Sequence, residues 1–269
     1  MRIIYLFLAG LLTLILAYPS WANEDDLRQR ILNHLRAATS LAEIHEPPSE
    51  IAALLPYGPD LYSSLVGEEL YPRLVDAVVY IVTEEGILGA GTVISSSFGL
   101  IITNWHVIGN EKVVGLVFKP RGSNGTISFE KDDIFFARVL TTDSIRDLAL
   151  LEIVSRPGKI IAVPLGSTSN LGAGHEVFSV SHPRGSLWSY SEGTISQITL
   201  RHEWVRGLGI VHRASTIQTQ TVSNNGGSGD PLFDEDGQFI GVLVGGNVTE
   251  PNFAISIDEI REFVFSSLR

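Results

Sequence analysis

Three residues in widely separated parts of the chain have the chemistry of a base, an orienting acid and a nucleophile. His106 follows an apolar run, Asp147 precedes one, and Ser228 lies in the glycine-rich loop Asn225–Asp230. A serine hydroxyl is a poor nucleophile at neutral pH unless a histidine takes its proton. A carboxylate must in turn hold that imidazole in the right tautomer. His106, Asp147 and Ser228 fit these roles, which are the roles of nucleophilic acyl transfer.

The glycines beside Ser228 allow backbone N–H groups to turn toward one point. The N–H groups of Gly226 and Ser228 are the candidates for an oxyanion hole, in which each donor contributes about 3 kcal/mol in comparable enzymes. The order along the chain excludes an α/β-hydrolase, because that fold places serine first and histidine last. The order histidine, aspartate, serine is that of chymotrypsin-like enzymes.

Six segments resemble HtrA/Deg-type trypsin-like serine proteases, in the order expected for that family. They are Gly89–Ile94 (GAGTVI), Gly99–Val107 (GLIITNWHV), Arg146–Leu151 (RDLALL), Ser191–Ser196 (SEGTIS), Ile217–Gln220 (IQTQ) and Asn252–Ile255 (NFAI), with the serine loop between the last two. The resemblance covers about Pro72 to the C-terminus. It implies an all-β fold of two six-stranded antiparallel barrels with the active site between them. No PDZ-like segment follows, so the resemblance is to the protease domain only.

Two residues of the serine loop depart from the family pattern G-N-S-G-G. Gly227 stands where the family has Asn or Asp, and Asp230 stands where it has glycine. Aspartate tolerates a positive φ better than most residues do. Its charge would nevertheless oppose the developing oxyanion unless the carboxylate is paired or turned away. His182 and Pro183 stand where the family has an Asn-Pro turn, which favours a structural role for His182.

The resemblance also implies the walls of the primary specificity pocket. Its residues would be Thr221, Val222 and Ser223 before the serine loop and Leu243, Val244 and Gly245 opposite. All six are small or uncharged. The sequence therefore predicts a preference for small or aliphatic uncharged side chains of a polypeptide substrate.

The first 22 residues have the pattern of a secretory signal peptide. Arg2 precedes an apolar run from Ile3 to Ala17, and small residues precede a cleavage position after Ala22. An uncleaved membrane anchor is the alternative, although the run is shorter than the roughly 20 residues that a membrane span needs. The sequence thus predicts an exported protein that has no membrane segment after cleavage.

The composition indicates the cellular compartment and excludes some classes of partner. The chain has 269 residues, no cysteine and a net charge of −11. Export without disulfides indicates the bacterial periplasm or the extracellular space. The acidic balance disfavours nucleic acid and anionic membranes as partners. The histidines show no H-E-x-x-H or similar spacing, so we expect neither a metal nor another cofactor.

Hydrophobic periodicity divides the rest of the chain into three parts. A helical extension is expected over residues 23–71, because Leu27, Ile31 and Leu35 recur at helical spacing. The protease domain is expected over residues 72–269, with barrels at about 72–160 and 161–257 and a closing helix from Asp258 to Leu268. The expected strands are 78–82, 92–95, 100–103, 113–118, 134–140 and 148–153, then 177–180, 194–198, 217–221, 231–233, 239–244 and 253–256.

These observations together predict an exported serine endopeptidase that attacks extended or unfolded polypeptides through an acyl-enzyme. Two alternatives stay open because of Gly227 and Asp230. One is a binding module that keeps the protease fold but lacks a competent oxyanion hole. The other is a latent enzyme whose serine loop must be reordered by a partner.

Overall fold

We analysed a computed structural model of the chain. It describes residues 25–33, 65–120, 127, 129–155, 157–183, 186–206, 209–221, 227–245 and 252–267. The predicted signal peptide and most of the predicted helical extension lie outside the described residues.

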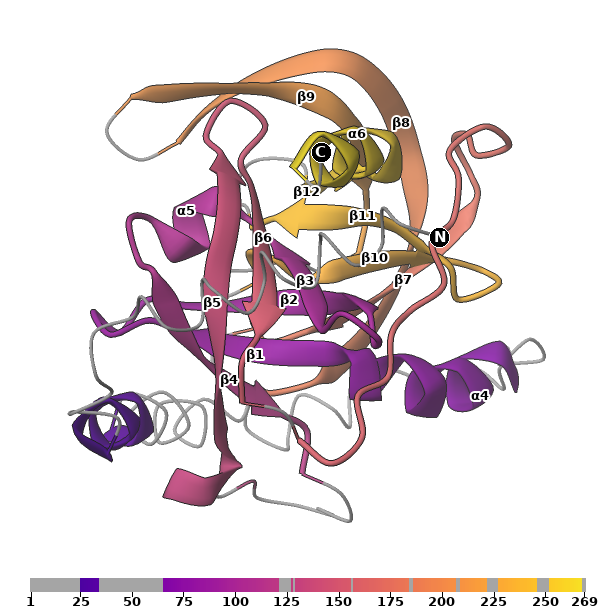
Figure 1. Ribbon diagram of the computed structural model, residues 1–269. Helices are drawn as coiled ribbons and strands as arrows, with labels where there is room; N and C mark the ends of the chain where they lie inside the picture. The colour runs from indigo at the N-terminus through magenta and orange to yellow at the C-terminus, as the bar shows by residue number, and fades with distance from the viewer. Residues whose placement is uncertain are drawn as a thin grey trace, which may run out of the picture.

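Two closed antiparallel barrels of six strands each form the body of the molecule (Figure 1). The first has the spatial order β1-β2-β3-β6-β5-β4 and the second β10-β11-β12-β9-β8-β7. The strands are β1 (Val78–Val82), β2 (Leu88–Ser95), β3 (Leu100–Thr103), β4 (Val113–Phe118), β5 (Ile134–Asp143), β6 (Leu148–Ile153), β7 (Glu176–Ser181), β8 (Ser189–Arg206), β9 (Ile210–Thr219), β10 (Pro231–Asp234), β11 (Phe239–Val244) and β12 (Asn252–Ser256). The all-β, two-barrel fold predicted from the sequence is confirmed.

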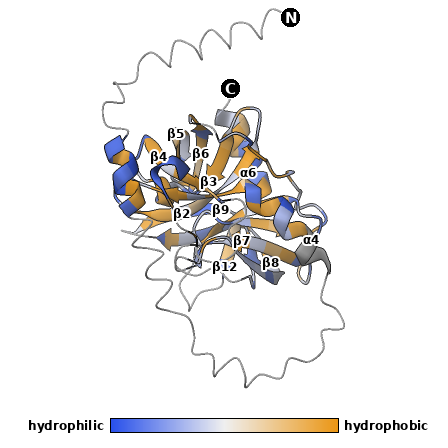
Figure 2. Cartoon of the chain, turned by 90° about the horizontal axis from the view of Figure 1, so that it is seen from below, coloured by the Kyte–Doolittle hydropathy of each residue, from blue (hydrophilic) through white to orange (hydrophobic). Residues whose placement is uncertain are grey.

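In the cartoon coloured by hydropathy, hydrophobic residues predominate in the strands, while the helices include many hydrophilic residues (Figure 2). One core cluster fills the first barrel and continues across the contact between the barrels to Phe178, Trp188 and Phe233. A smaller cluster, which includes Val177 and Leu232, fills the second barrel. Successive residues of a strand face opposite sides, so a strand buried at every position, such as β1, must be covered on both faces.

The helices from residue 65 onward are α4 (Leu65–Leu74), the 3-10 turn η2 (Val75–Ala77), α5 (Trp105–Ile108), η3 (Lys131–Asp133) and α6 (Ile257–Ser267). Of these, α6 lies close to the predicted closing helix from Asp258 to Leu268, whereas α5 and η3 were not predicted. Before the first barrel the sequence predicts short helical turns and loop, because Gly67 and Pro72 are helix breakers. The structure instead has the ten-residue helix α4 with Pro72 inside its last turn. Leu70 and Leu74 on this helix are buried in the core, and that packing outweighs the poor propensity.

The hairpin of β8 and β9 is much longer than predicted. The sequence predicts strands at 194–198 and 217–221, whereas β8 has 18 residues and β9 has ten. Register shifts near Ile195 and between Thr199 and His202 bend the pair, and it curves away from the second barrel as one long ribbon (Figure 1). Its outer half is mostly exposed and held by the ladder of backbone hydrogen bonds, so it lacks the apolar alternation on which the prediction relied.

A helix over residues 25–33 packs on the first barrel. Ile31 and Leu32 are buried in the same core cluster as the barrel strands. Gly115 in β4 makes this contact possible, because a Cβ at that position would lie 2.5 Å from Ile31 Cδ1. The segment is therefore part of the packed domain and not a separate surface appendage.

Replacing Ile31 by Ala should lower the free energy of unfolding by about 2–5 kcal/mol, because a fully buried side chain is truncated against a rigid strand. Chemical denaturation followed by circular dichroism measures the change. Asn33→Ala is the matched control on the exposed end of the same helix, where a change within about 0.5 kcal/mol is expected. Equal effects of the two substitutions would contradict the packing described here.

Candidate active site

The predicted base His106 lies on α5, a single helical turn that directly follows β3. Asn104 caps this turn with extended backbone, and its side-chain amide donates to the backbone carbonyl of Asp147 at 3.1 Å. The N–H of Trp105 donates to the same carbonyl, also at 3.1 Å. The turn that carries the imidazole is thus positioned by the backbone of the residue predicted to orient it.

Asp147 is fully buried and holds His106 with both carboxylate oxygens. Oδ1 accepts from the backbone N–H of His106 at 2.9 Å, and Oδ2 lies 2.7 Å from the ring nitrogen Nδ1. Because an ionised carboxylate only accepts, Nδ1 carries the proton and Nε2 keeps its lone pair. Nε2 has no hydrogen-bond partner among the described residues. This is the tautomer that can take a proton from a hydroxyl.

The loop that presents Asp147 is fixed by a network around Arg146. The Arg146 guanidinium contacts Asp143, Glu259 and Glu262, each at 2.8 Å, and so ties the loop to α6. Partial burial raises the pKa of Glu259, but the N–H of Ser215 and the Arg146 guanidinium lower it more, and the net pKa lies below the usual value. Asp147 itself has a φ of 58°, a conformation that aspartate tolerates better than most residues.

The serine loop is pressed between two strands from different barrels. The Ser228 carbonyl accepts from the Ala90 N–H in β2 at 2.9 Å, and the Gly229 N–H donates to the Leu243 carbonyl in β11 at 3.0 Å. Gly229 has a φ of 86°, and a Cβ there would lie 2.0 Å from the Ala90 carbonyl oxygen. Only glycine fits this position. The loop is therefore held to both barrels through its backbone.

An arginine from the long hairpin reaches the nucleophile. Nη2 of Arg206 lies 3.2 Å from Ser228 Oγ, and Nη1 donates to the carbonyl of Gly245. The hydroxyl of Ser228 is thus engaged by a guanidinium, and no hydrogen bond between Ser228 Oγ and His106 Nε2 occurs among the described residues. Arg206 was not predicted from the sequence, because its place depends on the length and bend of a hairpin that was itself missed.

Asp230 is buried and paired with a histidine. Its Oδ1 lies 3.3 Å from Nδ1 of His182, and both side chains are fully buried. Burial raises the pKa of Asp230 to about 6, although the hydrogen bond and the charge of His182 lower it. Asp230 and His182, which both stand where the family pattern has other residues, therefore contact each other. The sequence shows both residues but not that they are neighbours in space.

The structure describes only some of the residues predicted to bind substrate or the oxyanion. Gly226, Val222 and Ser223 lie outside the described residues. Thr221 is buried, and its N–H donates to Thr219 Oγ1. Leu243 and Val244 are buried in β11, where the Leu243 N–H donates to the Asp230 carbonyl at 2.8 Å. Gly245 directly follows β11; its carbonyl accepts from Arg206, and a Cβ on it would lie 2.7 Å from Ser228 Oγ.

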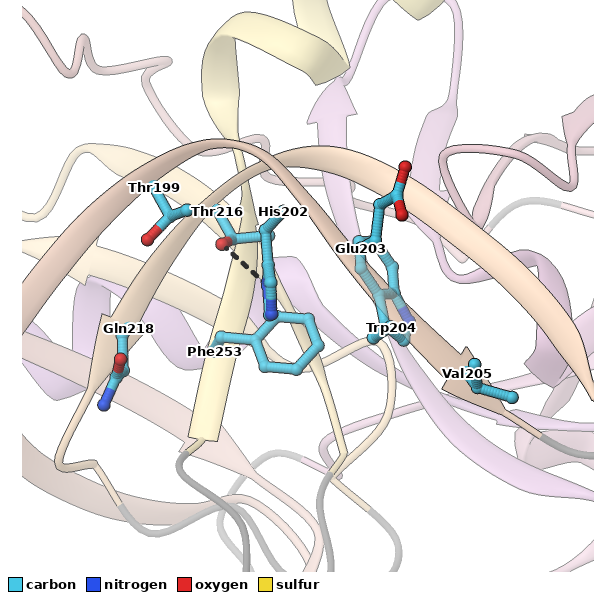
Figure 3. Close-up of a pocket in the computed structure, with 8 residues that line it drawn as sticks. All are labelled: Thr199, His202, Glu203, Trp204, Val205, Thr216, Gln218 and Phe253. Carbon is cyan, nitrogen blue, oxygen red and sulfur yellow. Dashed lines mark hydrogen bonds between the residues drawn. The ribbon is translucent and has the colours of Figure 1, made fainter.

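A cavity of about 410 Å³ lies under the hairpin, next to the residues that lead to Arg206 (Figure 3). His202, Trp204 and Phe253 supply aromatic walls, and Thr216 Oγ1 lies 3.1 Å from His202 Nδ1. Phe253 pairs with Val244 across β11 and β12, which connects the cavity to the strand that carries Gly245. The cavity was not predicted from the sequence.

The described residues hold no group of three or more His, Cys, Asp or Glu that could bind a metal. They also include no helix that is both long and apolar enough to cross a membrane.

Comparison with known proteins places this site in a family. Residues 89–242 match the trypsin-like peptidase domain. The chain is 26% identical to "Serine protease HTRA1A" of Danio rerio over 83% of this chain and 44% of that protein. It is 32% identical to "Putative serine protease HhoA" of Synechocystis sp. over 64% of this chain and 41% of that protein.

A solved structure, "Crystal structure of Deg5", superposes with a TM-score of 0.57 at 28% identity, and covers 73% of this chain and 91% of that one. The chain spans less than half the length of the first two curated relatives. The matched segment contains His106, Asp147 and Ser228, and the resemblance to HtrA/Deg proteases seen in the sequence is confirmed. The chain belongs to the trypsin-like peptidase family, in the company of the HtrA and DegP proteases.

Proposed function

We propose that the protein is a serine endopeptidase that cleaves extended or unfolded polypeptides. The observation that carries this proposal is the buried carboxylate of Asp147 bonded to His106 Nδ1 at 2.7 Å, with Nε2 left without a partner among the described residues. With the proton on Nδ1, the lone pair of Nε2 is available to take a proton from a hydroxyl.

In the proposed reaction, His106 Nε2 takes the proton of Ser228 Oγ while Oγ attacks the peptide carbonyl carbon. The carbonyl electron pair moves to oxygen, and the N–H groups of Gly226 and Ser228 stabilise that oxyanion. Collapse of the intermediate breaks the C–N bond, and His106 returns the proton to the departing amine. A water molecule then hydrolyses the acyl-enzyme by the same steps and regenerates Ser228.

The finer features of the proposal follow the sequence. The protein would be exported to the periplasm or beyond the cell by residues 1–22, with residues 23–71 as extension and 72–269 as protease domain. A curated relative bears the name "Periplasmic serine endoprotease DegP" (Salmonella typhimurium), which supports this compartment. Substrate side chains would meet the walls formed by residues 221–223 and 243–245, for which we propose small or aliphatic uncharged groups.

A latent enzyme is the second candidate, and the position of Arg206 favours it. The guanidinium engages both Ser228 Oγ and the Gly245 carbonyl, two groups that a bound peptide would need. Ser228 Oγ accepts from Arg206 and makes no hydrogen bond to His106 Nε2 in this position, so it must move toward His106 before it can be deprotonated. Movement of the β8–β9 hairpin would then precede acylation.

The first test is labelling of the purified protein by a fluorophosphonate probe. The wild-type protein should be labelled, and Ser228→Ala should not, because the probe forms a covalent bond to the activated oxygen. Asp147→Asn should be labelled about 10³–10⁴-fold more slowly, since the imidazole loses its tautomer and orientation. Absence of labelling in every form, with folding intact, would instead support a binding module or a latent enzyme.

The second test addresses the contact between Arg206 and the serine. Arg206→Gln should be labelled about 10-fold faster than wild type, because roughly 1.4 kcal/mol is a typical value for a charge-assisted hydrogen bond that must be broken first. Arg213→Gln, on the opposite strand of the same hairpin, is the control: it contacts Glu203 at 3.8 Å at the surface and should leave the rate unchanged. A slower rate in Arg206→Gln would show that Arg206 helps the reaction and would exclude the latent state described here.

A further inference from the structure

We propose that His182 and Asp230 form a positioning pair that holds the Ser228 loop from inside the molecule, and that uptake of a proton by this pair slows acylation. The inference rests on the proposed function, since it concerns the same nucleophile. It assigns a task to two residues that the reaction above does not use.

The imidazole of His182 is locked in place by aromatic rings. It stacks on Tyr80 of β1, with ring centroids 4.9 Å apart and an angle of 27°, and the edge of Trp188 lies 5.3 Å away at 70°. Trp188 is itself fixed by a hydrogen bond from Nε1 to the Val78 carbonyl at 2.9 Å. His182 thus lies at the contact between the barrels and has little freedom to follow a loop that moves.

Asp230 connects the fixed His182 ring to the turn that contains Ser228. Within the described part of the loop, Gly227 and Gly229 have no side chain, so Asp230 supplies the side-chain anchor. Its N–H donates to the Gly227 carbonyl at 3.3 Å, which closes a turn around Ser228, and its carbonyl accepts from Leu243 at 2.8 Å. A shift of the Asp230 carboxylate would therefore move a turn whose second residue is the nucleophile.

The pair is also placed to respond to pH. Burial raises the pKa of Asp230 to about 6, against the opposing hydrogen bond and charge of His182. The titratable side chains that face this carboxylate in the described structure are His182, which follows β7, and Tyr80 from β1. The pKa of Tyr80 is raised by burial and by the charge of Asp230, so Tyr80 stays neutral.

The hydrogen bond between Asp230 and His182 determines whether a fall in pH strengthens or weakens the hold on the serine loop. Above about pH 6 the Asp230 carboxylate accepts from His182 Nδ1 in a charge-assisted bond, which is stronger than a neutral one. Below that pH the carboxyl gains a proton, and the bond between loop and barrel weakens. The loop is therefore held best at neutral and alkaline pH. Oδ2 of Asp230 and Nε2 of His182 have no hydrogen-bond partners among the described residues, so the bond from Nδ1 to Oδ1 is what joins the two side chains.

The test compares labelling rates of Asp230→Ala, Asp230→Asn, His182→Ala and the double alanine variant. Each single alanine substitution should slow fluorophosphonate labelling about 10- to 100-fold, the size expected when a catalytic group is misplaced by about 1 Å. The double variant should be no slower than the single ones, because the two residues act as a unit. Asp230→Asn keeps the shape but only an uncharged hydrogen bond, so at neutral pH it should react more slowly than wild type and faster than the alanine variants, and it should fold if they do not.

The pH profile separates this role from a purely structural one. As the pH drops below about 6 the labelling rate of wild type should fall more steeply than that of Asp230→Asn, because only wild type has the Asp230 carboxyl to protonate there. Asp234→Asn is the matched control in the adjoining strand β10. It removes a buried carboxylate that bonds the N–H groups of Asp236 and Gln238, away from the serine loop, and it should keep the wild-type rate and profile.

Nuclear magnetic resonance gives a readout that does not depend on catalysis. The backbone amides of Gly227 and Gly229 should shift with a midpoint near pH 6 in wild type and should not do so in Asp230→Asn. Wild-type protein that does not react with the fluorophosphonate, but in which these amides still titrate, would refute the proposed function and support the pair. Suppose instead that the protein reacts with the fluorophosphonate, but that substitution of Asp230 changes neither the amide shifts nor the rate of that reaction. This result would refute the role of the pair and leave the proposed function standing.

Discussion

The contact between the serine loop and β2 is the constraint on which the candidate site depends. Each barrel closes on itself, so neither can bring His106 and Ser228 together alone. The peptide group of Ala90 connects them: its N–H donates to the Ser228 carbonyl at 2.9 Å, and its carbonyl accepts from Thr103 Oγ1 at 2.6 Å, three residues before His106. Gly229 lies so close to this peptide group that any side chain would separate the barrels.

The buried pair of His182 and Asp230 is poor evidence for stability but good evidence for a fixed geometry. Two polar groups removed from water lose hydration that one hydrogen bond hardly replaces, and a well-packed apolar pair would often be as stable. Glycine at position 230 would avoid that cost, yet it would also leave the loop held by backbone bonds alone. A paired carboxylate directed at His182 also answers the concern raised by the sequence, since a charge bonded inside the molecule opposes an oxyanion less than an unpaired one would.

Local sequence was enough to predict the strands of the first barrel and the helix α6, because apolar residues and turn residues mark them clearly. The contact between His106 and Asp147 was likewise predicted, since their flanking residues resemble a known family. The reach of β8 to Arg206 was not predictable in the same way. That strand is stabilised by pairing with β9 outside the barrel, and hydrophobic periodicity carries no information on pairing without burial. The helix α4 was missed for the opposite reason, because tertiary burial of Leu70 and Leu74 outweighs the local preference of Pro72.

The long hairpin connects Arg206 to the other half of the site through a series of ring contacts. Trp105, next to His106, lies 6.1 Å from His212 on β9, and His212 stacks on Trp204 of β8 at 5.4 Å. Trp204 in turn meets Phe253 edge to face at 5.1 Å, beside the cavity. The backbone N–H of Arg213 also donates to the Ile145 carbonyl at 2.7 Å, two residues before Asp147. Because these contacts and Arg206 belong to one two-stranded ribbon, a shift of the ribbon that frees Ser228 also reaches the loops that carry His106 and Asp147.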